Sequence, residues 1–519
     1  MISKAYPIDI SGIKSVGTEE WMNNYYIPVT GKEFQDIYNK VFALYVDNIK
    51  QYNDDVAYWV AISNIKITVK IAQYILECLR LLRLKEKKYE YIIGEEKKRV
   101  PEFIHINRIN KIITNLGPQE RIKNIIRTVK YNVSNPFFVI KNMSNLSEMP
   151  FIIGSKSQVE VVAYCKANKI DTFHLPLMLF ARKTTLDSKD PQVIKVFEFI
   201  RGYLIAISKE YPVIDNLALK RLSKEVEEYF IQSLLFFQMN LNVFRKHKPK
   251  TLLTTGLGSE VYRLFCAAWR CAGGEVIGFV HGHSYCNSYM PGIIIYLSLV
   301  NQYITLSEGH KGLLQHAKED FSCGLKTGNI TSIKQEYYYH LYNKLQGNKP
   351  VQNIKKIMLI GFPMSNFYYC GFPGGFAFAQ LDMELRLVKL LRAKGYYIMY
   401  KPHPVTMNEI EGVFDNYVDD IVEDRYENVY DIADCVMFGD YSTTTFGFSL
   451  LTNRPIVLID VKGNYHFPKS FELLNKRCSI VMAELDESGR INFDENAVLN
   501  AVEESVNNIN YDILYKFAF

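Results

Sequence analysis

Two short polar motifs in the last third of the chain carry residue types that bind phosphate. The first motif, KPHP, occupies positions 401–404 and follows the apolar run at 396–400, whereas the second, DYSTT, occupies positions 440–444 and follows the apolar run at 435–438. Such runs indicate buried strands, so we predict that each motif stands where a strand ends. The hydroxyl residues of DYSTT suit the first turn of a helix, whose free N–H groups and positive dipole end bind anions.

KPHP has a structural and a functional interpretation. On its own it could be a solvated loop whose prolines end a strand, with His403 a bystander. Paired with a second motif in the same predicted half, it favours a phosphate site, because ligands of α/β sheets bind where the strands end. In that site Lys401 and His403 neutralise phosphate charge, and we assign Pro404 to the same site.

DYSTT has the same two interpretations. Ser442, Thr443 and Thr444 could be only a helix cap and its neighbours, a role that stabilises a helix by about 1 kcal/mol. One of them can cap while another binds phosphate, so the two roles are compatible. Asp440 would repel a phosphate unless it faces a ribose or only holds the turn. We assign all four residues to the phosphate site.

An irregular run rich in aromatic residues and glycine, at 361–376, follows the predicted strand at 356–360. It could be a packed segment without regular structure. Its length without a regular pattern favours a functional loop over the ligand. We therefore include Gly361, the first residue of the run, among the ligand-binding residues.

Candidates for a general base lie in the middle of the chain. His281 and His283 flank a glycine just after the predicted strand at 275–280, and residues two apart on an extended chain point to one side. Either imidazole could deprotonate an acceptor hydroxyl or help to hold phosphate. Glu260 is the best-placed carboxylate for the same task, although a glutamate in a first helical turn also stabilises the helix dipole. The other histidines, including His466, lack a comparable context and are interpreted as structural or surface residues.

Short apolar runs alternate with helix-length segments in two blocks of the sequence. This alternation predicts an α/β protein with parallel strands and crossover helices, in two Rossmann-like halves. Two such halves facing a cleft form the GT-B architecture, with ligands at the carboxyl ends of the strands. The predicted strands are at 137–140, 151–154, 251–255, 275–280, 303–306, 356–360, 396–400, 435–438 and 456–460.

The first part of the chain has apolar residues at the three- and four-residue spacing of helices and shows no candidate chemistry. We predict a helical N-terminal region over 1–132, an acceptor-side domain over 133–345 and a donor-binding domain over 346–519. A polar segment with glycine and proline, at 344–355, is the predicted linker. Single helical regions are predicted at 191–246 and at 495–519.

Composition limits the function classes. The chain has 519 residues, 48% of them hydrophobic, and a net charge of +6, which is too small over this length to indicate nucleic-acid binding. The segment 80–130 has fourteen Lys or Arg residues against six Glu, as in a solvated helical surface or one that rests on an anionic membrane.

The nine cysteines are scattered, without CxxC pairs or Cys/His clusters at metal spacing. A His–x–His zinc site at 281–283 lacks a third ligand at useful spacing, so we expect no metal and no bound cofactor. Reduced thiols indicate a cytoplasmic protein, and no apolar run escapes interruption by charges. We therefore expect at most peripheral contact with the inner face of the plasma membrane.

The segment 429–460, VYDIADCVMFGDYSTTTFGFSLLTNRPIVLID, resembles bacterial envelope-polysaccharide transferases. CDP-glycerol glycerophosphotransferases of teichoic acid synthesis have a comparable run after a basic-x-His-Pro motif. Bacterial sialyl-, polysialyl- and Kdo transferases share an HP motif and a later Ser-Ser/Thr motif. Both groups are similar to GT-B enzymes with cytidine nucleotide donors. In the teichoic acid enzymes HG usually continues as HGTPLK, whereas here the run from position 281 is HGHSYCNS.

The resemblance implies a metal-independent glycosyltransferase of capsule, lipopolysaccharide or related glycan synthesis. We expect a CMP-activated donor such as Kdo or a nonulosonate, and a glycan or lipid-linked glycan as acceptor. In this hypothesis a base from the first half activates the acceptor while Lys401, His403 and the helix after Ser442 receive the leaving CMP. The enzyme alternative is CDP-glycerol or CDP-ribitol phosphotransfer. An alternative of another class is a non-catalytic GT-B-like module that binds nucleotide or glycan.

Overall fold

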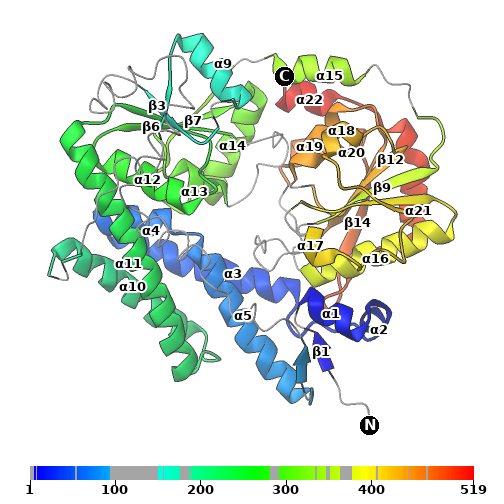
Figure 1. The fold of residues 1–519 in the computed structure, drawn as a ribbon, viewed down its shortest axis with the longest axis horizontal. Coiled ribbons are helices and arrows are strands. Elements are labelled where there is room, and N and C mark those ends of the chain that lie inside the picture. Colours follow the sequence, from blue (N-terminus) through cyan, green and yellow to red (C-terminus); the bar gives the residue numbers. More distant parts are fainter. Residues whose placement is uncertain are drawn as a thin grey trace, which may run out of the picture.

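The computed structural model describes residues 5–7, 9–52, 55–89, 91–93, 150–155, 157–175, 186–187, 189–280, 292–333, 336–346, 351–362, 377–404, 407–441, 443–462 and 466–519. Within these residues two large β-sheets, almost entirely parallel, occupy separate halves of the molecule and are accompanied by many helices (Figure 1). The predicted α/β class with parallel strands is confirmed.

The first sheet has six parallel strands in the order β4-β3-β5-β6-β7-β8. The direction of strand addition reverses beside β3, so the carboxyl ends of β3 and β5 flank the switch point of the sheet. The strands are β3 (Phe151–Ile153), β4 (Phe173–His174), β5 (Thr251–Thr254), β6 (Glu275–Phe279), β7 (Gln302–Thr305) and β8 (Asn329–Ser332).

The second sheet has seven strands in the order β11-β10-β9-β12-β13-β14-β15, and only the pair β14–β15 is antiparallel. Numbered along the chain, the first six strands are ordered 3-2-1-4-5-6, which is the Rossmann order, with the switch point between β9 and β12. The strands are β9 (Lys356–Ile360), β10 (Tyr397–Lys401), β11 (Asp420–Ile421), β12 (Cys435–Phe438), β13 (Ile456–Val461), β14 (Ser479–Leu485) and β15 (Ile491–Asn492).

Crossover helices connect the strands of each sheet. Around the first sheet they include α9 (Val159–Asn168), α12 (Glu260–Cys271), α13 (Ile293–Leu297) and α14 (Glu308–Phe321). Around the second they are α16 (Ala377–Ala393), α17 (Met407–Ile410), α18 (Tyr426–Val429), α19 (Thr444–Leu451) and α20 (Pro468–Arg477). Helices α21 (Glu495–Glu504) and α22 (Asp512–Phe517) follow the last strand, and α15 (Tyr337–Leu345), which follows β8, contacts α19.

Several predicted elements differ from the observed ones. The helical region predicted at 191–246 is two helices, α10 (Pro191–Glu210) and α11 (Asn216–His247), and the Asp215 side chain caps the second. The helix predicted at 495–519 is also broken, because a 3₁₀ turn and a short coil separate α21 from α22. The strand predicted at 137–140 lies outside the described residues.

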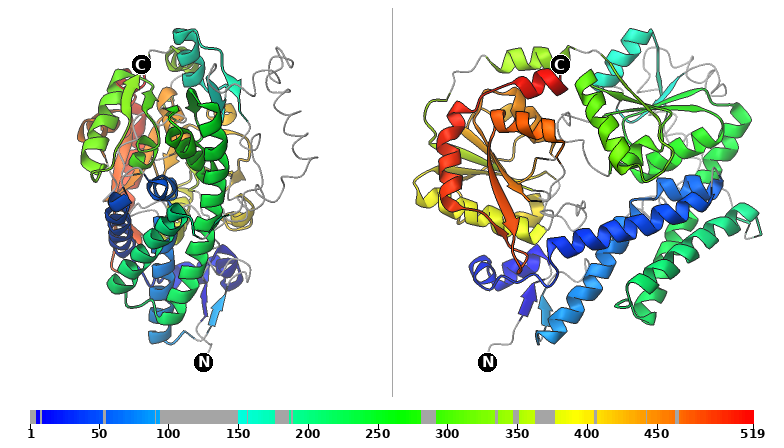
Figure 2. Two further views of the ribbon diagram at one scale, coloured as in Figure 1. Left: turned by 90° about the vertical axis from the view of Figure 1, so that its left-hand side faces the viewer. Right: turned by 180° about the vertical axis from the view of Figure 1, so that it is seen from behind.

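The N-terminal helices contact both halves of the molecule. They are α1 (Ile10–Val16), α2 (Thr18–Asn23), α3 (Gly31–Ile49), α4 (Val56–Ser63) and α5 (Ile67–Glu86), and a two-stranded parallel sheet of β1 (Ala5–Pro7) and β2 (Tyr91–Ile93) accompanies them. Helices α3 and α4 pack against α10, and α4 against α12, on the side of the first sheet. The front and rear views show α3 running from α1 and α2 toward α4 (Figures 1 and 2).

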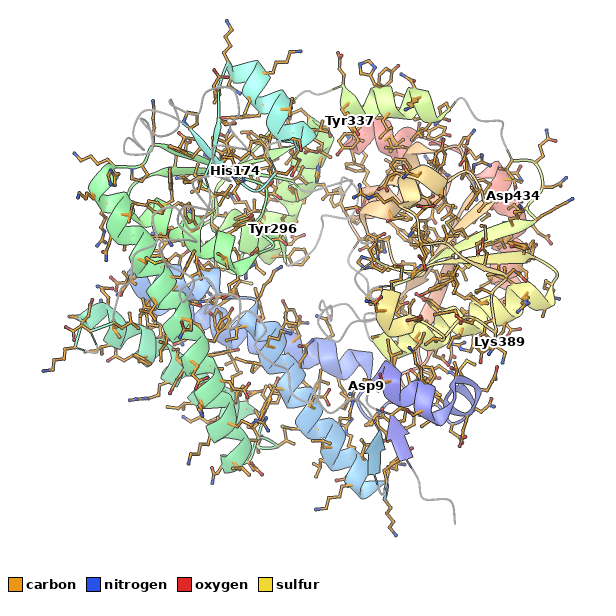
Figure 3. The ribbon with its side chains drawn as sticks, in the orientation of Figure 1. Asp9, His174, Tyr296, Tyr337, Lys389 and Asp434 are labelled. Atoms are coloured by element: carbon orange, nitrogen blue, oxygen red, sulfur yellow. The ribbon has the colours of Figure 1, made fainter. Side chains whose placement is uncertain are left out.

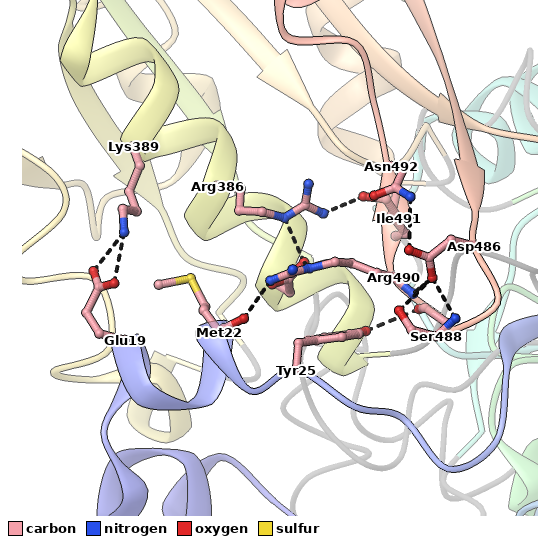
Figure 4. Close-up of polar contacts among 12 residues, drawn as sticks. Glu19, Met22, Tyr25, Arg386, Lys389, Asp486, Ser488, Arg490, Ile491 and Asn492 are labelled. Carbon is pink, nitrogen blue, oxygen red and sulfur yellow. Dashed lines mark hydrogen bonds and ion pairs between the residues drawn. The ribbon is translucent and has the colours of Figure 1, made fainter.

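Polar contacts join the segment that contains α2 to the half of the molecule built on the second sheet, which we call the second sheet unit (Figure 4). Glu19 forms an ion pair with Lys389 of α16 at 2.9 Å. The Arg490 guanidinium donates to the Met22 carbonyl oxygen at 2.8 Å and lies over the Tyr25 ring at 4.8 Å. The first residues of the chain therefore rest on a unit that begins more than three hundred residues later in the sequence.

Contacts at the C-terminus also join the two units. The Ser307 hydroxyl, just before α14, donates to the Phe517 carbonyl oxygen of α22 at 2.7 Å. A methyl group on Gly309 would overlap the Lys516 carbonyl oxygen, so glycine permits the close approach of α14 and α22. Near the same contact, the ring of His316 on α14 stacks on Phe467 with centroids 4.9 Å apart.

At the amino edge of the second sheet, a carboxylate joins the starts of two strands. Asp434, labelled in Figure 3, accepts hydrogen bonds from the backbone N–H groups of Lys355 and Lys356 at 2.9 and 2.8 Å. These contacts tie the start of β9 to the start of β12, so the two strands leave the sheet in register at the opposite edge. None of the helices described is both long and apolar enough to span a bilayer.

Candidate functional site

Three chain segments leave the second sheet side by side at its carboxyl edge. Ile360 at the end of β9 is paired with Lys401 of β10 on one side and with Phe438 of β12 on the other. Neighbouring strands lie about 4.8 Å apart, so residues 361–362, 402–404 and 439–441 emerge within about 10 Å of one another. The two polar motifs predicted from the sequence are therefore brought to one edge, around the switch point.

Lys401 is the last residue of β10, and only 5% of its surface is exposed. Burial lowers the pKa of its ammonium group below the usual value, and the carboxylates of Glu427, Asp424 and Glu423 partly offset this effect. A buried cation of this kind gains most when an anion binds beside it.

His403 is half-buried two residues farther along. Burial, followed by the positive charge of Lys401, holds the pKa of its imidazole below the usual value. The ring is therefore largely neutral near pH 7 and becomes easier to protonate when a negative charge arrives. Pro404 is exposed in the turn that follows.

Gly361 connects β9 to the end of β10. Its N–H group donates to the Lys401 carbonyl oxygen at 2.9 Å. A methyl group on Gly361 would overlap the hydroxyl group of Tyr400, so only glycine fits here without displacing that ring. Tyr400 is fully buried and stacks on Phe414 with ring centroids 3.8 Å apart. The rest of the predicted loop, 363–376, lies outside the described residues.

A buried carboxyl group contacts the end of β10 and the residues that follow β9. Glu384 of α16 is fully buried, and its oxygens accept from the Tyr400 hydroxyl at 2.8 Å and the Phe362 N–H at 2.9 Å. Burial raises the pKa of this carboxyl group to about 8, although both hydrogen bonds act in the opposite direction. Glu384 is thus mainly protonated at neutral pH. No sequence pattern indicates this role, because Glu384 lies within an ordinary helical pattern.

The DYSTT motif leads into α19, which begins at Thr444. Thr443 is the N-cap, and its hydroxyl oxygen accepts from the Phe446 N–H at 3.1 Å. Thr444 is the exposed first residue of the helix, and Asp440 is partly buried in the preceding turn. Ser442 lies outside the described residues. The predicted capping by a hydroxyl residue is confirmed for Thr443.

The opposite end of α19 is held by a buried cation. Arg477 of α20 is fully buried, and its guanidinium donates to carbonyl oxygens in the last turn of α19 and just after it. A positive charge at a helix C-terminus compensates the negative end of the dipole. The acceptors are Leu450 at 3.3 Å, Ser449 at 3.2 Å, Thr452 at 2.7 Å and Arg454 at 3.1 Å.

His466, interpreted from the sequence as a structural or surface residue, lies beside the turn that precedes α19. Its Nε2 is 3.0 Å from a carboxylate oxygen of Asp460, a residue of β13 that is 2% exposed. Its ring stacks on Tyr441 of the DYSTT motif, with centroids 4.4 Å apart. An Asp at the end of a predicted strand followed by a nearby His was the only available sequence signal.

The candidates for a general base in the first half are not brought together as the two phosphate motifs are. His281 and His283 lie outside the described residues, so their placement stays a prediction. Glu260 begins α12 but is only 2% exposed, and it accepts from the Ser233 hydroxyl of α11 at 3.5 Å. Its carboxylate also interacts with Tyr229 of α11. This environment favours the alternative in which Glu260 stabilises its own helix and the packing of α11.

The loop between β5 and α12 is nevertheless well supported. Arg263, 2% exposed, donates to the carbonyl oxygens of Leu257 at 3.1 Å and Gly258 at 2.8 Å. A third hydrogen bond, to the Ser63 carbonyl oxygen at 2.7 Å, ties the loop to α4.

Among the described residues no group of three or more His, Cys, Asp or Glu side chains could hold a metal ion.

Residues 366–464 match the sequence model of the family described as CDP-Glycerol:Poly(glycerophosphate) glycerophosphotransferase. The matched segment contains both polar motifs and the strands β10, β12 and β13 that position them. It is similar to a transferase family and supports part of the predicted resemblance. No individual curated protein matches the chain.

Proposed function

We propose that this protein is a transferase that uses a CDP-linked polyol, such as CDP-glycerol, to add polyol phosphate to an acceptor. The observation that carries the proposal is the convergence of KPHP and DYSTT at the switch point of the second sheet, inside the segment similar to glycerophosphotransferases. This match favours the polyol-phosphate alternative over the CMP-sugar donor that we placed first on the sequence.

The geometry suits a diphosphate. Lys401 and His403 lie on one side of the strand ends, and the N-terminal turn of α19 lies on the other. An anion between them would relieve the desolvation of the Lys401 ammonium group and favour protonation of His403. Its remaining oxygens could accept from free N–H groups of the first helical turn.

In the proposed reaction an acceptor hydroxyl attacks the phosphorus atom that carries the polyol. The new P–O bond forms as the bond to the bridging oxygen breaks, and CMP leaves with that oxygen. Negative charge builds on the departing phosphate, where Lys401 and His403 stabilise it. The hydroxyl proton passes to a base from the first half. We assign that base to His281 or His283, since the burial of Glu260 argues against it.

We further propose a GT-B arrangement in which the acceptor lies between the two sheet units. The strand orders of the two sheets and the contacts of α22 with α14 support this arrangement. A glycan or lipid-linked acceptor would be reached from the cytoplasmic face of the membrane. Much of the basic segment 80–130 lies outside the described residues, and its contact with anionic lipid stays a proposal.

A CMP-activated sugar is the second candidate donor. It is favoured by HGHSYCNS at 281–288, which lacks the Thr-Pro-Leu-Lys continuation of the teichoic acid enzymes. The two donors differ in the bond that breaks, because a CMP-sugar reacts at its anomeric carbon and a CDP-polyol at phosphorus. A donor assay therefore separates them.

The test is CMP release by the purified full chain from CDP-glycerol, CDP-ribitol and CMP-Kdo. We expect release from a CDP-polyol, and a loss of at least a hundredfold in Lys401→Met, which keeps the buried volume but removes the charge. Lys394→Met, at an exposed position after α16, is the matched control. Release from CMP-Kdo alone would establish the second candidate. Failure of calorimetry to detect binding of CDP or CMP would instead support a non-catalytic role.

A further inference from the structure

The residues Asp460, His466 and Tyr441 form a contact chain from the end of β13 to the candidate phosphate site. Asp460 is 2% exposed and lies 3.0 Å from Nε2 of His466. The His466 ring stacks on Tyr441 at 4.4 Å with an angle of 29° between the rings. Tyr441 is 3% exposed and lies between Asp440 and Ser442 in the turn that precedes α19.

We propose that the Asp460–His466 pair is a positioning element of the phosphate site, which acts through Tyr441 to hold the turn before α19. The proposal rests on the proposed function only for the identity of the ligand. Asp460 accepts the Nε2–H hydrogen bond and so fixes the orientation of the imidazole, as carboxylates do for functional histidines in general. The oriented ring then gives Tyr441 a flat, rigid surface.

The packing around His466 supports a positioning role rather than a chance contact. The imidazole also contacts Phe471 of α20, with ring centroids 4.7 Å apart. The same helix carries Arg477, which holds the carbonyl oxygens at the other end of α19. Helix α20 thus secures α19 at both ends, with His466 just before its start. Displacement of the N-terminal turn by even 1 Å would misalign its N–H groups with a bound phosphate.

The consequence for the chemistry is indirect. His466 does not have to touch the ligand, because its Nε2 is engaged with Asp460. It determines where Thr443 and the first N–H groups of α19 stand relative to Lys401 and His403. Loss of the pair should therefore weaken nucleotide binding without removing a ligand contact. It should also loosen the turn in the free protein.

The test combines hydrogen exchange with calorimetry on the full chain. His466→Gln keeps a side-chain N–H donor for the buried Asp460 but removes the ring. We expect the amides of Phe446 and Gly447, which donate to Thr443, to exchange at least tenfold faster in this variant, and its affinity for CDP to fall at least fivefold. His340→Gln is the matched control, because His340 lies exposed on α15 beside Glu336. It should change neither quantity.

A second variant keeps the proposal testable if His466→Gln is unstable. Tyr441→Leu should produce the same local increase in exchange, and the double variant should add little to Tyr441→Leu alone, because both changes break one contact chain. Unchanged exchange at Phe446 and Gly447 in folded His466→Gln would overturn the inference, whatever the nucleotide result. Faster exchange with unchanged CDP affinity would overturn the link to the phosphate site. If the wild type binds neither CDP nor CMP while exchange still rises, the proposed ligand fails and the positioning of the turn stands.

Discussion

The carboxyl group of Glu384 lies 2.8 Å from the hydroxyl group of Tyr400, in the interior beneath the carboxyl edge of the second sheet. The same carboxyl group accepts from the N–H group of Phe362 at 2.9 Å. It therefore joins the chain leaving β9 to the last residues of β10, one residue before Lys401. Because this carboxyl group gains or loses a proton near neutral pH, the stability of the site should depend on pH.

The first prediction concerns the pH dependence of stability. The pKa of Glu384 is about 8 in the folded protein, whereas it is near 4.5 in the unfolded chain. Between these values the folded state holds a proton that the unfolded state has lost, so stability falls as the pH rises from about 4.5 to 8. The limiting slope for one group is about 1.4 kcal/mol per pH unit.

Glu384→Gln should flatten that dependence. Glutamine resembles the protonated carboxyl group, so we expect little change in the free energy of unfolding near pH 5 and a more stable variant near pH 8. Urea denaturation at several pH values measures the difference. Glu411→Gln, at an exposed position, is the control and should leave the slope unchanged. Parallel pH profiles for wild type and Glu384→Gln would show that this carboxyl group is not the source.

The second prediction concerns His403 and nucleotide binding. The pKa of its imidazole is below the usual value in the free protein, because of burial and the charge of Lys401. A bound phosphate should raise that pKa, so the complex holds more protons than the free protein in the range between the two values. Affinity for CDP should therefore increase as the pH falls from 8 to 6.

Calorimetry in two buffers with different ionisation enthalpies measures this proton uptake directly. In wild type we expect uptake of a fraction of a proton on binding CDP near pH 7. His403→Gln should abolish most of it and weaken binding by about tenfold, the loss of one charge-assisted hydrogen bond. His340→Gln, at an exposed position of α15, should retain the wild-type uptake. Equal uptake in His403→Gln and wild type would place the titrating group elsewhere.

For some strands of the second sheet, the first and last residues could be predicted from the sequence. Apart from Lys356 at the start of β9, the strands β9 and β12 are apolar runs, because both faces of a parallel sheet are buried, and that pattern is local. The short edge strands β11 and β15 have only two residues each and carry no such signal. KPHP and DYSTT were located for the same reason, since each follows a strand whose pattern is clear.

The supporting residues of the site could not be found in this way. Glu384 meets Tyr400 only after α16 has folded back on the sheet, and His466 meets Tyr441 across a separate strand. The attachment of the N-terminal segment depends on Arg490 and Met22, which are 468 residues apart and leave no periodic pattern. Such contacts between distant residues arise from the fold and are invisible to spacing arguments.

The third prediction concerns Gly361. A methyl group there would overlap the Tyr400 hydroxyl group, and Tyr400 is fixed by Glu384 and by stacking on Phe414. Gly361→Ala should therefore cost about 1–3 kcal/mol of stability through overpacking. Gly312→Ala is an informative control, because nothing lies within 4 Å of the added methyl group. In the interior of α14 it should stabilise the protein by up to about 1 kcal/mol. Similar effects of the two substitutions in thermal denaturation would contradict the close approach at Gly361.

The fourth prediction separates two contacts that join the N-terminal segment to the second sheet unit. Arg490 donates to the fully buried carboxylate of Asp382 at 2.6 and 2.9 Å, and also to the Met22 carbonyl oxygen. Lys389 pairs with Glu19 at the surface, where both side chains are about half exposed. Removing one partner of a buried pair leaves an uncompensated charge, which costs about 3–5 kcal/mol, whereas exposed pairs contribute about 1 kcal/mol or less.

Arg490→Met should therefore destabilise the protein far more than Lys389→Met in urea denaturation. Arg386 also contacts Asp382, at 2.8 Å, and will retain part of the compensation, which places the expected loss near the lower end of that range. The double variant Asp382→Asn with Arg490→Met should lose less stability than the sum of the single variants, because the neutral side chain no longer needs a cation. Limited proteolysis within residues 9–30 should accelerate in Arg490→Met, since its bond to Met22 is lost as well. Equal, small effects of Arg490→Met and Lys389→Met would mean that the apolar contact of Trp21 with Phe378, rather than the buried ion pair, holds the segment in place.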